Sequence, residues 1–249
     1  RQFRRFKTFE NLAMQIGILE PKMFSSHAIF LLKKIGNVSC YNGSDLKLFL
    51  SPLNILFVRL SYNIDRFFLT NCPNLKWICS PTTGHNHLDI DCLKINNINI
   101  LTLKDEKCFL KSIRATPEHT FGLILSVLRR YNIAFTDIRN GIWDRDKCIG
   151  EELNGNKIGI IGLGRVGHQV AKYCDAFGAE IIWHDNREVT SSPNWIKSDS
   201  VLDVIKSSRV IILCADYKKN QKPIIGTKEI KNLHERYFIN TSRGELVDE

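Results

Sequence analysis

The sequence predicts an α/β protein made of two parallel-sheet domains. Three observations favour this class: short apolar runs alternate with helix-like segments in the first half, an apolar helix signal starts near residue 116, and a strand–glycine loop–helix–strand unit begins at Lys157. Such alternation indicates parallel sheets, because two parallel strands need a long crossover that is usually a helix. The chain has 249 residues, which exceeds the usual ~150 of one domain. We therefore expect one domain in residues 1–115 and a second in residues 116–249.

The composition is that of a globular protein. Hydrophobic residues make up 43% and charged residues 24%, which excludes disordered, collagen-like and coiled-coil chains. No apolar run approaches the ~20 residues of a membrane span, and no secretory signal is visible. The chain begins with Arg1 rather than Met, so we expect its natural start to lie upstream.

The chain is basic, with a formal net charge of +9. Basicity is compatible with nucleic acid or anionic small molecules as partners. The basic residues are dispersed, however, and the densest runs, Arg1–Lys7 and Lys218–Lys222, are short. We expect a solvated basic surface on a protein that handles small anions, without a nucleic acid or membrane partner.

The cysteines indicate a reducing compartment. The chain has eight cysteines, and none forms a CxxC pair. In a chain of this length, this pattern predicts reduced thiols in a cytoplasmic protein. Cys79, His85, His87 and Cys92 lie close in sequence, but their spacing fits no common zinc pattern. We expect no metal site.

The first half reads as three strands and two helices. The strands are Ile55–Arg59, Trp77–Cys79 and Ile98–Leu103, and the helices are Ser25–Ile35 and Ile64–Asn71. The segment Ser80–Gly84 follows the second strand, and a Gly-containing loop at that position can present backbone N–H groups to an anion. An ordinary strand-to-helix turn remains the alternative.

A helix is predicted at Thr116–Tyr131. Thr116 is its candidate cap, and Pro117 lies in its first turn, where a missing N–H costs no hydrogen bond. The following FGLILSVL is apolar nearly all round, so we expect burial between other elements. Residues 147–156 then read as a loop.

The second half begins with the sequence pattern of a nucleotide-binding unit. It contains a strand at Ile158–Ile161, the loop Gly162–Gly167, a helix at His168–Phe177 and a second strand at Ile181–Trp183. A strand at Val210–Cys214, a helix at Thr227–Leu233 and a strand at Tyr237–Asn240 follow.

The glycine loop has the context that dinucleotide binding requires. Gly162 permits a tight turn, Gly164 lets a diphosphate approach the backbone, and Gly167 lets helix and strand pack closely. The diphosphate would lie at the helix N-terminus, which favours negative charge. The carboxylate of Asp185 can accept hydrogen bonds from the adenosine ribose hydroxyls, and its charge would repel a 2′-phosphate. Asp185 therefore favours NAD over NADP. Arg187 is close enough in sequence to reduce that preference. A Rossmann fold with an empty site is the alternative.

Two further residues follow strands of the same sheet. Cys214 ends one strand, and Arg243 comes shortly after another, so both should lie at the edge that carries the glycine loop. A guanidinium beside the nicotinamide can bind a carboxylate and polarise a carbonyl. An Arg that only pairs with an acid is the alternative for Arg243.

Together these strings resemble the D-isomer-specific 2-hydroxyacid dehydrogenase family, which includes D-3-phosphoglycerate dehydrogenases. The strings that carry the resemblance are Val58-Arg59, Thr83-Gly84 with Leu88-Asp89, Thr116–Thr120, Gly141–Asp144, Glu152–Gly155, the glycine loop with Asp185, and Ile239–Glu249. The last string is the most specific of them.

The resemblance implies the fold, the reaction and the site residues. The fold would be a flavodoxin-like substrate domain followed by an NAD-binding Rossmann domain, and the reaction a reversible NAD-dependent hydride transfer between 2-hydroxy and 2-keto acids. Arg243 matches the catalytic arginine, and Arg59, Thr83 and Gly84 match substrate-binding positions. The implied cofactor-binding set is Gly162, Gly164, Arg165, Val166, Gly167, Asp185, Cys214, Thr241 and Ser242, with Arg165 and Val166 at the diphosphate and Thr241 and Ser242 at the nicotinamide.

The sequence also departs from the family pattern. The family has an acid/base glutamate and histidine downstream of its arginine, and the chain ends at Glu249 before either position. We expect the natural chain to continue, and the 249-residue chain to bind cofactor weakly and turn over slowly. Ser80 replaces the arginine of phosphoglycerate-specific relatives, and Cys214-Ala215-Asp216 replaces a His-x-Pro string.

The resemblance also implies a partner and leaves a second function class open. The partner would be a second copy of the chain, in a homodimer built on the NAD domain and the helix at 121–128. The second class is a non-catalytic, NAD-sensing protein similar to a corepressor.

Overall fold

The structure, a computed structural model, describes residues 14–104, 106–218 and 220–249. The basic run Arg1–Lys7 and position 219 of the second basic run lie outside the described residues. The chain divides into two compact units, Arg1–Leu110 and Lys111–Glu249. Each unit contains its own five-stranded sheet, in which all strand pairs are parallel. The predicted class, α/β with two parallel sheets, is confirmed.

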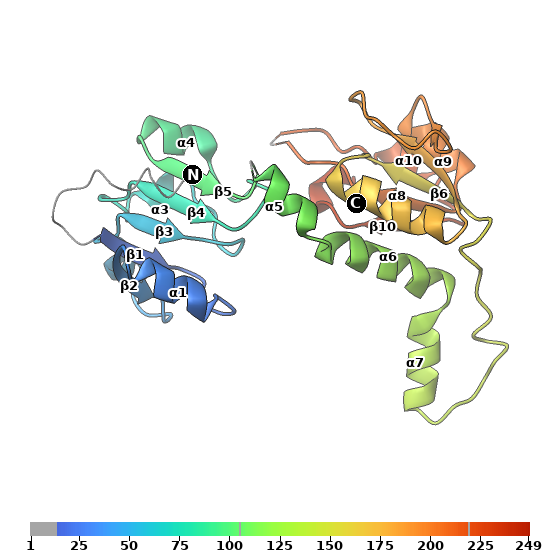
Figure 1. Cartoon of the computed structure of the whole chain (residues 1–249), viewed down its shortest axis with the longest axis horizontal. Helices are drawn as coiled ribbons and strands as arrows, with labels where there is room; N and C mark the ends of the chain where they lie inside the picture. The colour runs from blue at the N-terminus through green and yellow to red at the C-terminus, as the bar shows by residue number, and fades with distance from the viewer. Residues whose placement is uncertain (1–13, 105, 219) are drawn as a thin grey trace. The chain divides into compact units, whose positions relative to one another are not determined.

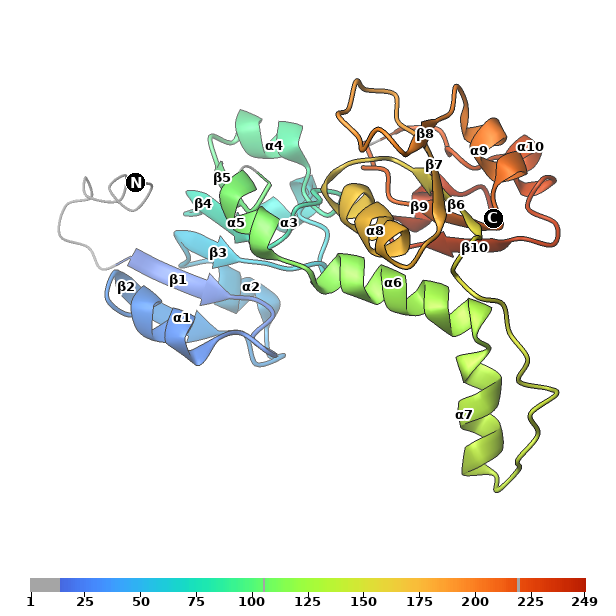
Figure 2. The ribbon, with the colours of Figure 1, turned by 45° about the vertical axis from the view of Figure 1, so that its right-hand side comes forward.

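The first unit has the strand order β2-β1-β3-β4-β5, which is the flavodoxin-like order. Its strands are β1 (Met14–Ile18), β2 (Gly36–Cys40), β3 (Ile55–Phe57), β4 (Trp77–Ser80) and β5 (Asn99–Thr102), seen side by side in Figures 1 and 2. Its helices are α1 (Ser26–Leu32), α2 (Leu46–Leu50), α3 (Arg66–Leu69), α4 (Ile90–Ile95) and α5 (Lys107–Ser112), of which α5 contains the division between the units.

Four helices of this unit start at a side chain that accepts a backbone N–H. The capping residues are Ser25, Asp45, Asp65 and Asp89. A short polar side chain there satisfies N–H groups that the first turn leaves without a helical partner. These caps fix where each helix begins and therefore where each preceding loop ends.

The second unit has the strand order β10-β9-β6-β7-β8. Its strands are β6 (Lys157–Ile161), β7 (Glu180–His184), β8 (Ile196–Lys197), β9 (Val210–Leu213) and β10 (Tyr237–Asn240). Its helices are α6 (Ala115–Leu128), α7 (Tyr131–Arg139), α8 (Arg165–Ala176), α9 (Val201–Ser207) and α10 (Thr227–Ile230), and the 3₁₀ turn η2 (Gly244–Leu246) follows β10.

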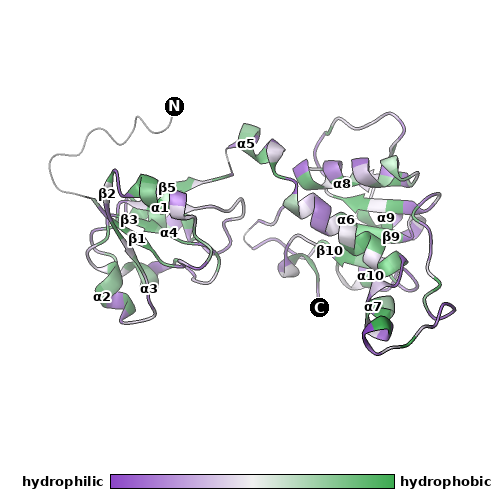
Figure 3. Cartoon of the chain, turned by 60° about the horizontal axis from the view of Figure 1, so that its bottom comes forward, coloured by the Kyte–Doolittle hydropathy of each residue, from purple (hydrophilic) through white to green (hydrophobic). Residues whose placement is uncertain are grey.

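The central strands of this sheet are buried on both faces. In β9, Val210 and Ile212 belong to the core cluster that includes α6 and α8, whereas Ile211 and Leu213 belong to the cluster that includes α9. Alternating side chains point to opposite faces of a sheet, so helices cover both faces. This explains why β6 and β9 read as continuous apolar runs. Figure 3 shows the strands mostly green, and α8 mixed green and purple, as a helix with one buried face should be.

The middle helix differs from its prediction in three ways. It starts at Ala115, so Thr116 lies inside the first turn and is not the cap. It ends at Leu128, because Arg130 adopts a left-handed φ of 54° and the chain turns into α7. Only one stripe of α6 is fully buried, made of Pro117, Thr120, Ile124 and Leu128. Within this unit, the expected burial of this helix between other elements is therefore complete along one stripe only, and its other apolar residues are partly buried.

Helix α7 and the segment that follows it extend away from the sheet of the second unit (Figures 1 and 2). The chain then returns through residues 140–156 to β6. Among the described residues, no helix is long and apolar enough to cross a membrane.

Candidate functional site

The glycine loop connects β6 to α8 in a conformation that only glycine tolerates. Gly162 has a φ of +93°, and a Cβ built there would lie 2.7 Å from the backbone of Ala215. A Cβ on Gly167 would lie 2.2 Å from the carbonyl oxygen of Gly162. Neither neighbour is a flexible side chain, so substitution would force the backbone to move. The structure thus gives a physical reason for both glycines.

The N-terminus of α8 is open. Gly164 occupies the cap position, and within the described residues no side chain caps this end of the helix. A Cβ on Gly164 would meet only the Nη2 atom of Arg187, at 3.6 Å. Uncapped N–H groups beneath an open glycine form a cradle suited to a diphosphate. The residues present therefore fit a dinucleotide.

The two residues after Gly164 lie in the first turn of α8. Arg165 is exposed, and its Nη1 is 3.5 Å from the carbonyl oxygen of Ile113. Val166 is half-buried and packs against the core. Arg165 therefore adds an exposed positive charge to the first turn of α8, and Val166 can offer its backbone N–H.

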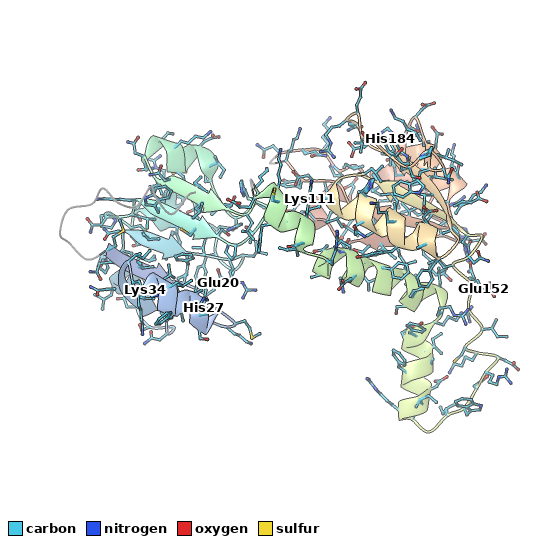
Figure 4. The ribbon with its side chains drawn as sticks, in the orientation of Figure 1. Glu20, His27, Lys34, Lys111, Glu152 and His184 are labelled. Atoms are coloured by element: carbon cyan, nitrogen blue, oxygen red, sulfur yellow. The ribbon has the colours of Figure 1, made fainter. Side chains whose placement is uncertain are left out.

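Asp185 lies beside the glycine loop, one residue after His184 at the end of β7 (Figure 4). Its side chain is 6% exposed, and its Oδ2 accepts the backbone N–H of Leu163 at 2.9 Å. Its other bonds come from Arg187, through the backbone N–H and Nε to Oδ1 and through Nη2 to Oδ2, each at 2.9 Å. The Arg187 hydrogen bonds, assisted by the Leu163 N–H, hold the pKa of Asp185 below its ordinary value.

The carboxyl end of β10 forms a second wall of the same edge. The Ser242 hydroxyl donates to the carbonyl of Leu213 at 2.8 Å, which ties this segment to β9. Arg243 is half-buried, and its Nη1 donates to the Ser242 carbonyl at 2.8 Å. An open cavity of about 520 Å³ adjoins these residues, lined by Ala115, Thr116, His119, Leu123, Asn240, Thr241 and Ser242.

Thr241 contacts Thr120, which lies in the string Thr116–Thr120 but to which the sequence gave no role of its own. The hydroxyls of Thr241 and Thr120 are 2.9 Å apart, and the Thr120 hydroxyl donates to the carbonyl of Thr116 at 2.8 Å. Thr120 is completely buried. Either hydroxyl could donate in the contact between Thr120 and Thr241. A threonine inside an apolar helix is the one sequence signal that could have found this contact.

Cys214 follows β9, and its backbone N–H donates to the carbonyl of Ile161 at 2.8 Å. Burial raises the pKa of its thiol to about 12, although the bond with Thr241 opposes this. Cys214 therefore stays protonated at neutral pH and can serve the site only as a small wall residue.

In the first unit, Arg59 and the loop containing Thr83 and Gly84 follow β3 and β4, which pair in parallel. All three therefore lie at the same edge of that sheet. Arg59 is exposed, and its Nη1 donates to the carbonyl of Lys22 at 3.2 Å. Its backbone N–H donates to Glu20, at the end of β1 (Figure 4).

Buried side chains brace this loop. The Ser80 hydroxyl lies 2.9 Å from the Thr82 hydroxyl and 3.2 Å from Nε2 of His87, and the Thr82 hydroxyl donates to the Gly84 carbonyl at 2.9 Å. Ser80 and His87 are 3% and 5% exposed. The backbone of Thr83 and Gly84 is thus held from beneath. Sequence spacing had suggested His87 only as an improbable metal ligand.

The structure brings the expected residues together in two sets. The residues of the cofactor set, with Arg243, surround one sheet edge of the second unit, and Arg59, Thr83 and Gly84 share one edge of the first. Among the described residues, no three His, Cys, Asp or Glu side chains are grouped as metal ligands.

Comparison with known proteins identifies the chain. The family described as D-isomer specific 2-hydroxyacid dehydrogenase, NAD binding domain, matches residues 121–249. A D-3-phosphoglycerate dehydrogenase of Methanocaldococcus jannaschii is 29% identical over 241 residues, which cover 94% of this chain and 45% of that protein. A glyoxylate reductase of Thermofilum pendens is 31% identical over 207 residues, covering 78% of this chain and 58% of that protein.

The fold is also found in solved structures. The crystal structure of a D-lactate dehydrogenase from Aquifex aeolicus, complexed with NAD and lactic acid, matches with a TM-score of 0.80 at 24% identity, over 94% of this chain and 70% of that one. The chain spans about half the length of the curated relatives that it matches. It belongs to the D-isomer specific 2-hydroxyacid dehydrogenase family, and residues 121–249 are its NAD-binding domain.

Proposed function

We propose that the whole protein catalyses reversible, NAD-dependent hydride transfer between a small 2-hydroxy acid and the corresponding 2-keto acid. One observation carries this proposal: an open helix N-terminus, a buried acid and an arginine line one edge of a sheet in an NAD-binding domain of this family. The helix N-terminus would bind the diphosphate of the cofactor, and the acid would bind its adenosine ribose. The arginine would bind the 2-keto acid.

The proposed cofactor residues act mainly through their backbone and shape. Gly162, Gly164 and Gly167 leave room for a diphosphate on the N-terminus of α8, and Arg165 and Val166 supply the contacts of its first turn. Asp185 accepts the adenosine ribose. Cys214, Thr241 and Ser242 line the nicotinamide end. The bound nicotinamide would supply or accept the hydride.

Arg243 is the proposed catalytic residue. Its guanidinium can bind the substrate carboxylate in bidentate fashion and place a second N–H on the carbonyl oxygen, where negative charge grows as hydride arrives. The bond to the Ser242 carbonyl limits the motion of this side chain. Orientation of this kind costs less entropy at the moment of reaction.

Residues 1–115 are the proposed substrate domain and residues 116–249 the proposed cofactor domain, although the two compact units divide five residues earlier, after Leu110. Thr83 and Gly84 would present backbone N–H groups to the substrate carboxylate, and Arg59 would add positive charge at the same edge. The buried Ser80–His87 contact supports this role, because an anion-binding loop must keep its N–H groups aligned.

A second copy of the chain is the proposed partner. Helix α7 and the following loop expose Phe135, Ile138, Trp143 and Ile149 to 59%, 56%, 79% and 66%. These apolar side chains lie on one projecting element, which a monomer would leave in water. We place the centre of the dimer here rather than on residues 121–128, of which several pack against α8. All eight cysteines are free, which suits a cytoplasmic protein.

The test is NADH titration by protein fluorescence, together with NADH oxidation by the full-length protein with glyoxylate, hydroxypyruvate and pyruvate. We expect saturable NADH binding and turnover of at least one 2-keto acid. Binding without any turnover would contradict the enzyme and favour the NAD-sensing alternative. Absence of NADH binding would contradict both.

A further inference from the structure

We propose that Arg187 sets the choice between NAD(H) and NADP(H), and that the protein accepts the 2′-phosphorylated cofactor despite Asp185. This inference rests on the cofactor site proposed above and concerns only its adenosine end.

The first observation is the geometry of the Asp185–Arg187 pair. Both carboxylate oxygens of Asp185 face the guanidinium, with Nε on Oδ1 and Nη2 on Oδ2 at 2.9 Å each. This is the bidentate fork that arginine forms with planar anions. The Arg187 backbone N–H and the Leu163 N–H add two further bonds. The four bonds fill the usual acceptor capacity of a carboxylate.

The consequence is that Asp185 does not act as a bare negative charge. An isolated acid at the ribose rejects NADP because it repels the 2′-phosphate. Here the guanidinium, in direct contact, cancels most of that field. The ribose hydroxyls of NAD must also compete with Arg187 for the carboxylate of Asp185. This competition lowers the affinity for NAD and so reduces its preference over NADP.

The second observation is where Arg187 lies. Its Nη2 is the atom nearest to the Cβ position of Gly164, at 3.6 Å. The guanidinium therefore spans the distance from Asp185 to the open end of α8. Its side chain is 69% exposed, whereas that of Asp185 is 6% exposed. An exposed guanidinium beside a buried acid can also bind a phosphate, because arginine forms the same bidentate pair of hydrogen bonds with phosphate as with carboxylate.

Other acidic residues near Asp185 and Arg187 repel the 2′-phosphate of NADP, but they do not prevent Arg187 from binding it. The Asp185 carboxylate, and to a smaller extent the charge of Asp216, raise the pKa of Arg187. Glu188 adjoins Arg187 in the chain. These acids disfavour a 2′-phosphate. We therefore infer a small difference in affinity between NAD(H) and NADP(H), and not a preference for NADP(H).

The experiment measures dissociation constants of NADH and NADPH, and of 5′-AMP and adenosine 2′,5′-bisphosphate, for the full-length wild-type protein and for its Arg187→Ala variant. We expect the wild type to bind NADPH within about tenfold of NADH. Because a charge-assisted hydrogen bond to the phosphate would be lost, Arg187→Ala should weaken the binding of NADPH and of the bisphosphate by about tenfold or more. NADH and 5′-AMP should bind with equal or slightly higher affinity, because the ribose hydroxyls no longer compete with Arg187 for the carboxylate of Asp185.

Two control variants sharpen the result. Arg187→Lys keeps the charge without the fork and should give an intermediate NADPH affinity. Asp216→Asn removes a nearby negative charge and should shift the ratio toward NADPH. An unchanged NADPH-to-NADH ratio in Arg187→Ala, with NADH binding intact, would overturn this inference alone. Failure of the wild type to bind either dinucleotide would overturn the cofactor site as well.

Discussion

The carboxylate of Asp185 accepts the backbone N–H of Leu163 at 2.9 Å, which joins the end of β7 to the glycine loop after β6. One buried side chain thus ties the residue that would recognise the ribose to the loop that would hold the diphosphate. The bond also means that a change at Asp185 reaches the loop itself.

Asp185→Asn should weaken NADH binding by about tenfold, because a neutral amide accepts the ribose hydroxyls less strongly than a carboxylate. The amide oxygen can still accept the Leu163 N–H, so the loop should keep its conformation. Fluorescence titration with NADH and NADPH checks this, and the NADPH affinity should not fall. Asp199→Asn, at an exposed acid in the same unit, is the matched control. Equal losses in both variants would contradict the proposed role.

Arg243→Ala should lower kcat/KM for 2-keto acids by about 10²–10³-fold, the usual cost of removing one donor to a developing oxyanion. Cofactor affinity should change little, because the residue meets the substrate. The check is steady-state kinetics of the full-length protein, with NADH titration in parallel. Arg66→Ala, at an exposed arginine in α3, is the control. A loss confined to NADH affinity would show that Arg243 serves the cofactor instead.

Gly167→Ala should destabilise the second unit by about 1–3 kcal/mol, because the new methyl group would overlap the carbonyl oxygen of Gly162 and the backbone must shift. Gly122→Ala is the matched control, since no atom lies within 4 Å of its Cβ position inside α6. There the change should stabilise by about 0.5–1 kcal/mol through helix propensity. Urea unfolding measures both, and destabilisation of similar size in the two variants would refute the packing argument.

Glu151→Gln should lower the free energy of unfolding at pH 7 by about 1 kcal/mol or less. Arg209 donates to Glu151 through Nε at 2.8 Å, and Tyr237 donates to it at 3.3 Å. The Arg209 hydrogen bonds hold the pKa of Glu151 below its ordinary value. Both partners are 35% exposed, so screening keeps the gain small.

The pH dependence follows from that direction. Since the folded pKa is lower than the unfolded one, the stabilisation is full above the unfolded value of about 4.3 and is lost as the pH falls through the folded value. The difference between wild type and Glu151→Gln should therefore disappear once the pH lies below the folded pKa of Glu151. Glu152→Gln, at the exposed neighbour labelled in Figure 4, should show no such trend. A difference that persists in acid would contradict an ionic origin.

Trp143→Asp should shift the protein from dimer to monomer, because it puts a charge into the apolar surface of α7 and its following loop. Light scattering over a range of concentrations measures the change. Phe67→Asp is the control: Phe67 is 82% exposed, close to the 79% of Trp143, but it lies in α3 of the other unit. A wild-type monomer, or dimers in both variants, would contradict the proposed interface.

The sequence by itself determined the elements whose signals are local. The apolar runs of β6 and β9, the glycine loop and Asp185 follow one another over short distances, and each pattern has few alternative structures. The edge strand β2 gave no such signal, because its residues are half-buried or exposed and read as polar. Helix α7 was not predicted: the expected helix ends at Tyr131, and nothing in the residue types marks a second helix after the left-handed turn at Arg130.

The tertiary structure alone decided the contacts that complete the site. Thr120 and Thr241 are 121 residues apart in sequence, yet their hydroxyls meet because α6 packs near β10. The bond from the Leu163 N–H to Asp185 also depends on tertiary structure, because it requires the glycine loop after β6 and the end of β7 to lie side by side. Periodicity and motif spacing report which face of an element is buried, but not which two elements meet. Which two elements meet depends on how side chains from the whole domain pack together. A short stretch of sequence does not include those side chains.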